Sequence, residues 1–157
     1  MILYMSLENV VVAPELSLAP LSYLNKFLVY FAEKCKKVIL TDYKSNKLVK
    51  KQYKTVKETY GLRESYETFI NMVSKNLIVT WEEEMHYYRF GVDETVKMKN
   101  GTPLITVVKV LEYGVSNVTP VPIFRKTLYR MAGNVRSLWL SFMSSSPIFK
   151  REVGYEM

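Results

Sequence analysis

Six apolar side chains recur at alternating spacings of three and four residues between positions 21 and 38. They are Leu21, Leu24, Leu28, Phe31, Cys35 and Val38. This spacing places all six on one face of an α-helix and predicts a helix over residues 19–39. Ser17 and Pro20 suit its N-terminus, because a serine cap and a first-turn proline are both favourable there. Other elements must cover this apolar face, so the stripe indicates where much of the core lies.

The following segments predict a second helix and a β-hairpin. Residues 44–60 are predicted to form a helix with lysines on one face and apolar or aromatic residues on the other. The apolar or aromatic residues are Val49, Tyr53, Val56 and Tyr60, and Gly61 is expected to end the helix. Residues 65–73 have a period close to two, and 77–83 are rich in strand-forming residues, so together they predict an antiparallel hairpin. Residues 85–92 extend this hairpin or form a third strand.

Two more helices are expected towards the C-terminus. Thr102-Pro103 can begin a helix over 103–113 that Gly114 ends, although the β-branched residues there also fit a strand. The last helix, over 122–143, is predicted from a second apolar stripe. Its members are Phe124, Leu128, Met131, Val135, Leu138 and Phe142. We therefore expect one α+β domain over residues 1–157. It would contain a small antiparallel β-sheet packed with helices and a long C-terminal helix, with extended arms at 1–13 and 144–157. The β-branched residues of 1–13 fit an extended arm or an edge strand.

The net charge of +7 comes from one stretch of the chain. Residues 33–57 contain nine lysines, two acids and no arginine, while basic and acidic residues balance elsewhere. We expect the side chains that follow to be mostly exposed: Lys44, Lys47, Lys50, Lys51, Lys54 and Lys57. Such a surface can meet nucleic acid or an acidic protein, or it can simply be a solvated helical face. The lack of arginine argues against base readout.

Composition and residue inventory argue against several functional classes. One cysteine, Cys35, excludes an intrachain disulfide framework and a cysteine-built zinc site, and we expect it to be a core residue. His86 is the single histidine, no glycine-rich phosphate loop occurs, and Glu82-Glu83-Glu84 is typical of a solvated strand end. No apolar run is long enough to span a bilayer, and the N-terminus lacks the basic start of a signal peptide. We expect no enzymatic activity, cofactor, metal or membrane association.

Two short motifs resemble those of a known family. The first is Val110-Leu111-Glu112-Tyr113-Gly114, followed by Pro120-Val121-Pro122-Ile123-Phe124-Arg125-Lys126-Thr127-Leu128. The second is Thr59-Tyr60-Gly61-Leu62-Arg63-Glu64-Ser65, in which one residue separates the threonine from the glycine. Over residues 59–130 the chain resembles the tail-completion or head–tail joining proteins in the neck of long-tailed bacteriophages. The order of elements (helices, a hairpin, a short helix ending in Glu-Tyr-Gly, then a long helix) is similar as well.

The resemblance implies a virion structural protein, assembled in the host cytoplasm. It would form a closed ring and join the head connector to the tail tube. The resemblance implies six copies, because long phage tails have sixfold symmetry. Genomic DNA would pass through the lumen, which the lysines would face unless they face an acidic neighbouring ring. We expect the interface between copies to include Glu112, Tyr113, Gly114, Pro120, Pro122, Phe124 and Arg125. The apolar arms would bury surface against the next copy.

The residues of the first motif also carry expectations of their own. Glu112 is the single acid between Glu94 and Glu152, so we expect it to pair with Arg125, Lys126 or Arg130. Gly114 permits a positive φ where the chain reverses after the short helix. A second functional hypothesis stays open beside the neck protein. In it the chain is a small basic nucleic-acid-binding module that uses residues 33–57.

Overall fold

A computed structural model describes residues 3–6, 21–82 and 87–144 of the chain. They form six helices and one three-stranded antiparallel sheet, so the expected α+β fold is confirmed. The strands are β1 (Leu3–Ser6), β2 (Leu77–Glu82) and β3 (Tyr87–Val92). The helices are α2 (Leu21–Ser45), α3 (Lys47–Tyr60), α4 (Tyr66–Asn76), α5 (Leu104–Tyr113), α6 (Ile123–Ala132) and α7 (Val135–Ser144).

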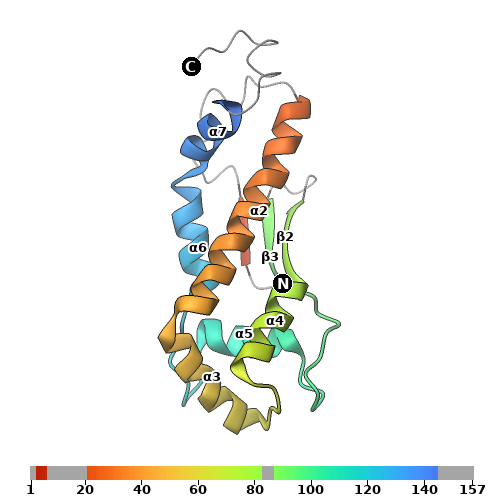
Figure 1. Cartoon of the computed structure of the whole chain (residues 1–157), viewed down its shortest axis with the longest axis vertical. Helices are drawn as coiled ribbons and strands as arrows, with labels where there is room; N and C mark the ends of the chain where they lie inside the picture. Colours follow the sequence, from red (N-terminus) through yellow and green to blue (C-terminus); the bar gives the residue numbers. More distant parts are fainter. Residues whose placement is uncertain (1–2, 7–20, 83–86, 145–157) are drawn as a thin grey trace.

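Helix α2 is the spine of the molecule and the other elements pack around it. Its 25 residues span about 37 Å at a rise of 1.5 Å per residue. In Figure 1, α6 and α7 lie alongside α2, the sheet lies behind it, and α3 lies at the end of the molecule opposite α7. The apolar stripe of α2 is buried at Phe31 and Cys35, and the buried face continues to Tyr43. The predicted helix is therefore confirmed and extends six residues further, to Ser45.

Strand β3 is the centre of the sheet. It pairs with β2 from Leu77 opposite Val92 to Glu82 opposite Tyr87, and with β1 on its other side. The buried Tyr88 of β3 donates a hydrogen bond of 2.8 Å from its hydroxyl to the carbonyl of Leu28, which ties the sheet to α2. Part of the predicted N-terminal arm is thus an edge strand. The rest of that arm, and the tail after residue 144, lie outside the described residues.

The strand predicted over 65–73 is wrong, because this segment forms helix α4. Its buried residues Phe69, Ile70 and Val73 follow helical spacing, and Ser65 caps the helix by accepting a hydrogen bond from the N–H of Thr68. The hairpin is instead made by β2 and β3. The alternation of polar and apolar residues misled the prediction, since a helix with buried residues at spacings of three and four also contains short alternating runs.

The long C-terminal helix predicted over 122–143 is not confirmed, because the segment is divided into α6 and α7. Gly133 and Asn134 separate the two helices, and glycine is among the poorest helix formers. The N–H groups of both residues bond to the end of α6: Asn134 donates to the carbonyl of Met131, at 3.1 Å. The other two predicted helices are confirmed, as α3 and α5.

Candidate functional site

Helix α3 is held at both ends by its own sequence. At the start, the Asn46 side-chain carbonyl accepts hydrogen bonds from the N–H groups of Leu48 (2.9 Å) and Val49 (3.3 Å). At the end, Gly61 adopts the left-handed conformation with φ +65° and ψ +35°, and its N–H donates to the carbonyl of Lys57. These two caps fix where the helix begins and ends.

The two faces of α3 differ completely in chemistry. The inward face buries Val49, Gln52, Tyr53 and Val56. The outward face carries the lysines, of which Lys47, Lys50, Lys51 and Lys54 are exposed and Lys57 is half-buried, and Lys44 of α2 is exposed beside them. No ion pair within 4.0 Å joins any of these six lysines to another residue in the described ranges. The predicted exposure is confirmed, and the partner of these lysines remains a prediction.

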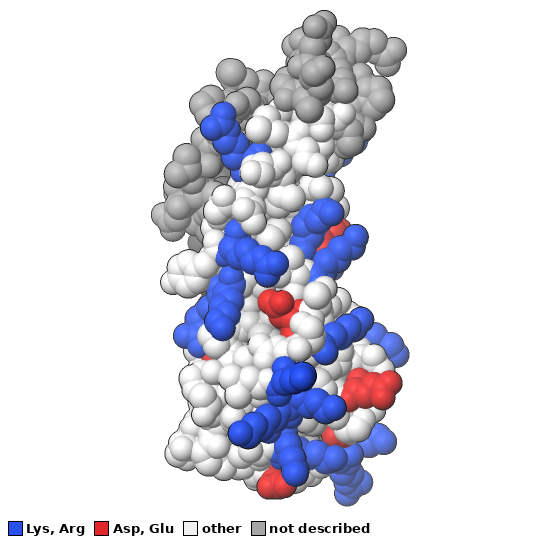
Figure 2. Space-filling view, turned by 60° about the vertical axis from the view of Figure 1, so that its left-hand side comes forward, with Lys and Arg blue, Asp and Glu red and all other residues white. Residues whose placement is uncertain are grey.

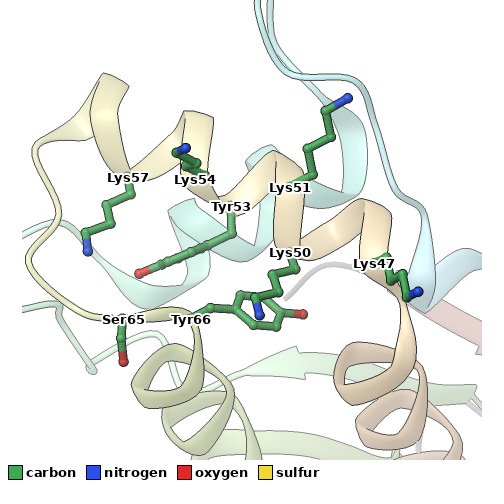
Figure 3. Close-up of a pocket in the computed structure, with 8 residues that line it drawn as sticks. All are labelled: Lys47, Lys50, Lys51, Tyr53, Lys54, Lys57, Ser65 and Tyr66. Carbon is green, nitrogen blue, oxygen red and sulfur yellow. The ribbon is translucent and has the colours of Figure 1, made fainter.

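The outward face borders a hollow of about 470 Å³ between α3 and the start of α4. Its lining is made of Lys47, Lys50, Lys51, Tyr53, Lys54, Lys57, Ser65 and Tyr66. Figure 3 shows Lys50 and Lys57 on the same side as the rings of Tyr53 and Tyr66, whereas Lys51 points away from both rings. A hollow with an aromatic floor and amines along one wall suits a negatively charged group of atoms.

A second hollow of about 310 Å³ lies next to the first and shares Lys50 and Tyr66 with it. Lys44 and Glu67 also line it, so the Glu67 carboxylate lies near the lysines here. Glu58 is the acidic residue of helix α3, and its side chain is exposed. Figure 2 shows basic side chains gathered over the end of the molecule that carries α3, with fewer acidic ones among them. The local potential is therefore positive.

The aromatic floor is fixed by hydrogen bonds to the backbone. The Tyr53 hydroxyl donates to the carbonyl of Glu64 at 2.9 Å, and the Tyr66 hydroxyl donates to the carbonyl of Tyr43. Burial raises the pKa of Tyr53 to about 12, with a smaller contribution from the Glu64 carboxylate, and burial also raises the pKa of Tyr66. Both hydroxyls therefore stay protonated at neutral pH and are occupied as donors. The floor offers ring surface rather than free hydrogen-bonding groups.

The loop between α3 and α4 is pinned from a distant part of the chain. Glu64 is buried, and its carboxylate accepts hydrogen bonds from the N–H groups of Arg63 (3.2 Å) and Lys99 (2.8 Å). The Asn100 side chain donates to the carbonyls of Tyr60 and Gly61. Our sequence analysis missed the contributions of Glu64, Ser65 and Tyr66. A serine followed by apolar residues at positions 66, 69, 70 and 73 is the signal that could have revealed α4 and with it the floor.

The predicted interface residues form a second ordered feature, where α5 meets α6. Glu112 is fully buried, and its carboxylate accepts hydrogen bonds from the N–H groups of Phe124 (2.9 Å) and Arg125 (3.0 Å). It also forms an ion pair with the Arg125 Nε at 3.0 Å, so the predicted pairing of Glu112 with Arg125 is confirmed. A carboxylate at the first N–H groups of α6 complements the partial positive charge of that helix end.

The other residues of this set differ in exposure. Tyr113 is exposed, and the centre of its ring lies 4.6 Å from the Arg125 guanidinium carbon. Partial burial is the main cause that raises the pKa of Tyr113; the Glu112 carboxylate raises it further, and Arg125 opposes both. Pro120 is exposed, Gly114, Pro122 and Arg125 are half-buried, and Phe124 is fully buried. Tyr113, Pro120 and part of Arg125 therefore reach the surface, whereas Glu112 and Phe124 hold the junction between α5 and α6 together from inside.

The residues considered for catalysis do not come together in the described structure. Cys35 is fully buried in α2, and burial raises the pKa of its thiol to about 12. Glu82 lies 3.1 Å from the Arg89 guanidinium, while His86, Glu83 and Glu84 lie outside the described residues. Within the described ranges there is no group of three His, Cys, Asp or Glu side chains that could hold a metal ion. None of the helices described is both long and apolar enough to cross a membrane.

Comparisons of the chain with protein-family models, curated proteins and solved structures find no match. Two features of the structure remain from which a function can be inferred. One is the lysine face, which consists of Lys47, Lys50, Lys51, Lys54 and Lys57 of α3 with Lys44 of α2. The other is the Glu112 junction, where the Glu112 carboxylate of α5 binds Phe124 and Arg125 of α6. The first offers positive charge without a partner in the described chain. The second orders a loop that reaches the surface at Tyr113 and Pro120.

Proposed function

We propose that the protein is a structural subunit of a tailed-phage neck, a ring-forming adaptor between the head connector and the tail tube. The observation that carries this proposal is the order and form of the elements around the resembling motifs. Helices α2 to α4 precede the β2–β3 hairpin, and the short helix α5 ends in Glu112-Tyr113-Gly114 before α6 begins. This follows the order that the resemblance implies, with two departures: helix α4 stands where the first strand of the hairpin was expected, and the last helix is divided in two.

The Glu112 junction supports a role in assembly. The loop between α5 and α6 is tethered at both ends, by the Glu112 carboxylate at α6 and by the hydrogen bond of 2.7 Å from the Val121 N–H to the Leu111 carbonyl. A loop that is already ordered loses little conformational entropy when it binds a neighbouring copy. Tyr113 and Pro120 then present rigid surface to that copy.

The lysine face has two placements in such a ring, towards DNA in the lumen or towards an acidic neighbouring ring. The alternative function, a small basic nucleic-acid-binding module, uses the same face without a ring. The two functions differ in where the binding energy lies, which is in symmetric protein contacts for the ring and in salt-sensitive phosphate contacts for the module.

The test is the mass of the purified chain in solution, with electron microscopy of the same sample. We expect a closed ring, of six copies by the resemblance. Deleting residues 147–157 should reduce the ring to smaller species if the C-terminal tail carries part of the association. A deletion of residues 1–12 removes β1 as well, so it is informative only where the truncated chain keeps its native circular dichroism. A full-length chain that stays monomeric at all concentrations contradicts the ring, and a monomer that binds DNA favours the module.

A further inference from the structure

We propose that a row of four lysines on α3 binds consecutive phosphates of duplex DNA, without reading its bases. This inference rests on the proposed function, because it selects DNA over an acidic neighbouring ring as the partner of the lysine face. The row consists of Lys47, Lys50, Lys54 and Lys57, all of which line the larger hollow. The argument uses their spacing, their chemistry and what surrounds them.

The spacing of the row suits a linear array of negative charges. At 100° per residue the four positions fall within about 80° of the helix circumference, so they form one stripe. At a rise of 1.5 Å per residue, neighbours in the stripe are separated by about 4.5 to 6 Å along the axis, over a total of about 15 Å. Duplex DNA carries one charge per about 1.7 Å of its axis on two strands, so a stripe of this length can face several phosphates.

The residue type favours phosphate over an acidic protein. Lysine binds phosphate as a flexible point charge, whereas the centres of protein interfaces are depleted in lysine and enriched in aromatic residues and arginine. The row contains no arginine, and the tyrosine floor beneath it uses its hydroxyls within the fold. Of the apolar side chains of α3, Leu48 is the large one that is exposed, and it lies outside the stripe. A protein partner would find little apolar surface to bury here.

The same features exclude base readout by this face. Specific contacts to base edges come from forked or amide side chains, such as arginine, asparagine and glutamine. Gln52 of α3 is buried on the opposite face, where its side-chain carbonyl accepts a hydrogen bond from the Thr119 N–H. Binding by this row should therefore depend on salt and not on sequence, which is what an adaptor around a moving duplex requires.

The experiment measures the affinity of the full chain for a 30-base-pair duplex of arbitrary sequence between 50 and 200 mM salt. Four phosphate contacts predict a slope of log K against log salt of about −3.6, and an affinity that falls about 150-fold over this range. Lys50→Gln with Lys54→Gln should make the slope less steep by about 1.8 for each subunit in contact. The arginine pair at the same positions should retain the slope, since it retains the charge.

A matched control changes Lys75→Gln and Lys97→Gln, two exposed lysines that line neither hollow. It should leave the slope within about 0.5 of the original. The proposal is overturned if the original chain does not bind duplex at 50 mM salt, if both glutamine pairs change the slope equally, or if two duplexes of different sequence differ more than tenfold in affinity. Polyglutamate that binds the row more tightly than the duplex would identify an acidic protein instead.

Ring formation is measured on every variant, so the two proposals can fail separately. Rings that do not bind duplex leave the neck adaptor standing and remove this inference. Duplex binding by a chain that forms no ring does the reverse and favours the alternative module. Circular dichroism of each variant verifies that the fold is retained, as expected because the substituted lysines are exposed on the surface.

Discussion

The Glu112 carboxylate should be the most important polar group for the stability of this fold. It is fully buried and accepts three hydrogen bonds, from the N–H groups of Phe124 and Arg125 and from the Arg125 Nε, at 2.9 to 3.0 Å. Glu112→Gln keeps the shape of the side chain and replaces one acceptor oxygen by an amide that can only donate. In one orientation the amide NH₂ would face the Phe124 N–H, and in the other it would face both the N–H and the Nε of Arg125.

The expected loss of stability follows from those contacts. Hydrogen bonds to charged groups contribute about 1.5–3 kcal/mol each, and a buried donor left without a partner costs about 1–3 kcal/mol. Retaining one or two of the three bonds offsets part of this, so we expect Glu112→Gln to lower the free energy of unfolding by about 3 kcal/mol. The partly exposed Arg125 can be hydrated, so Arg125→Gln should cost less than Glu112→Gln.

The assay is urea unfolding monitored through tryptophan fluorescence, with the buried Trp139 as the main reporter. With an m-value of about 2 kcal/mol per M, a loss of about 3 kcal/mol moves the midpoint by about 1.5 M. Protein concentration is held constant, because assembly contributes to apparent stability. The control is Glu33→Gln, the same substitution at an exposed residue 3.6 Å from Lys36, which should move the midpoint by less than about 0.3 M. Equal shifts for the two glutamine variants would refute this reasoning.

Three further outcomes follow from the structure. Gly114→Ala should lower the free energy of unfolding by about 3 kcal/mol or more, since the new Cβ would lie 2.7 Å from the Val118 carbonyl oxygen and the residue has φ +76°. Gly61→Ala should lower it by about 1 kcal/mol, because Gly61 has a positive φ but open space around it. Equal urea midpoints for the two variants would contradict this. Cys35 should react with a thiol reagent at pH 8 about a thousand times more slowly in the native chain than in urea, because burial raises its pKa to about 12. Between pH 10 and 12 the chain should lose stability as unfolded tyrosines ionise first, and Tyr53→Phe should reduce that loss, which urea midpoints across this pH window will measure.

The parts of the fold that the sequence predicts well are those where one signal acts alone. The stripe of α2 continues over five turns, so its period is unambiguous, and Pro103 and Gly114 mark both ends of α5. The pairing of Glu112 with Arg125 could also be predicted, because one acid in a basic region has few possible partners. Its depth could not: the sequence does not say that the carboxylate would be fully buried against the first N–H groups of α6.

Residues 65–73 show why a local pattern can fail. Tyr66 and Phe69 are spaced as on a helix, yet Ile70 and Met72 continue an alternation that also fits a strand. What decides is the cap at Ser65 and the packing of Phe69 against Tyr53, whose rings stack with centroids 4.6 Å apart. The second of these is a contact between two helices, and no window of one helix's length contains it. The break at Gly133 is a milder case, in which one glycine ends a helix although the apolar stripe continues.

The lysine face itself illustrates the difference between predicting charge and predicting a site. Counting lysines predicts an exposed basic helix, but a hollow beside it requires α4 to turn back beneath α3. That turn depends on Gly61 and on contacts made 35 to 40 residues along the chain. There the Lys99 backbone N–H donates to the Glu64 carboxylate, and the Asn100 side-chain amide donates to the Tyr60 carbonyl. Because these bonds hold the loop and not the lysines, weakening them by Asn100→Ala should change the shape of the hollow while leaving the charge of α3 intact. If phosphate binding depends on charge alone, neither the affinity nor its slope against salt will change in that variant. If binding also needs the tyrosine floor, the affinity will fall at every salt concentration while the slope stays the same.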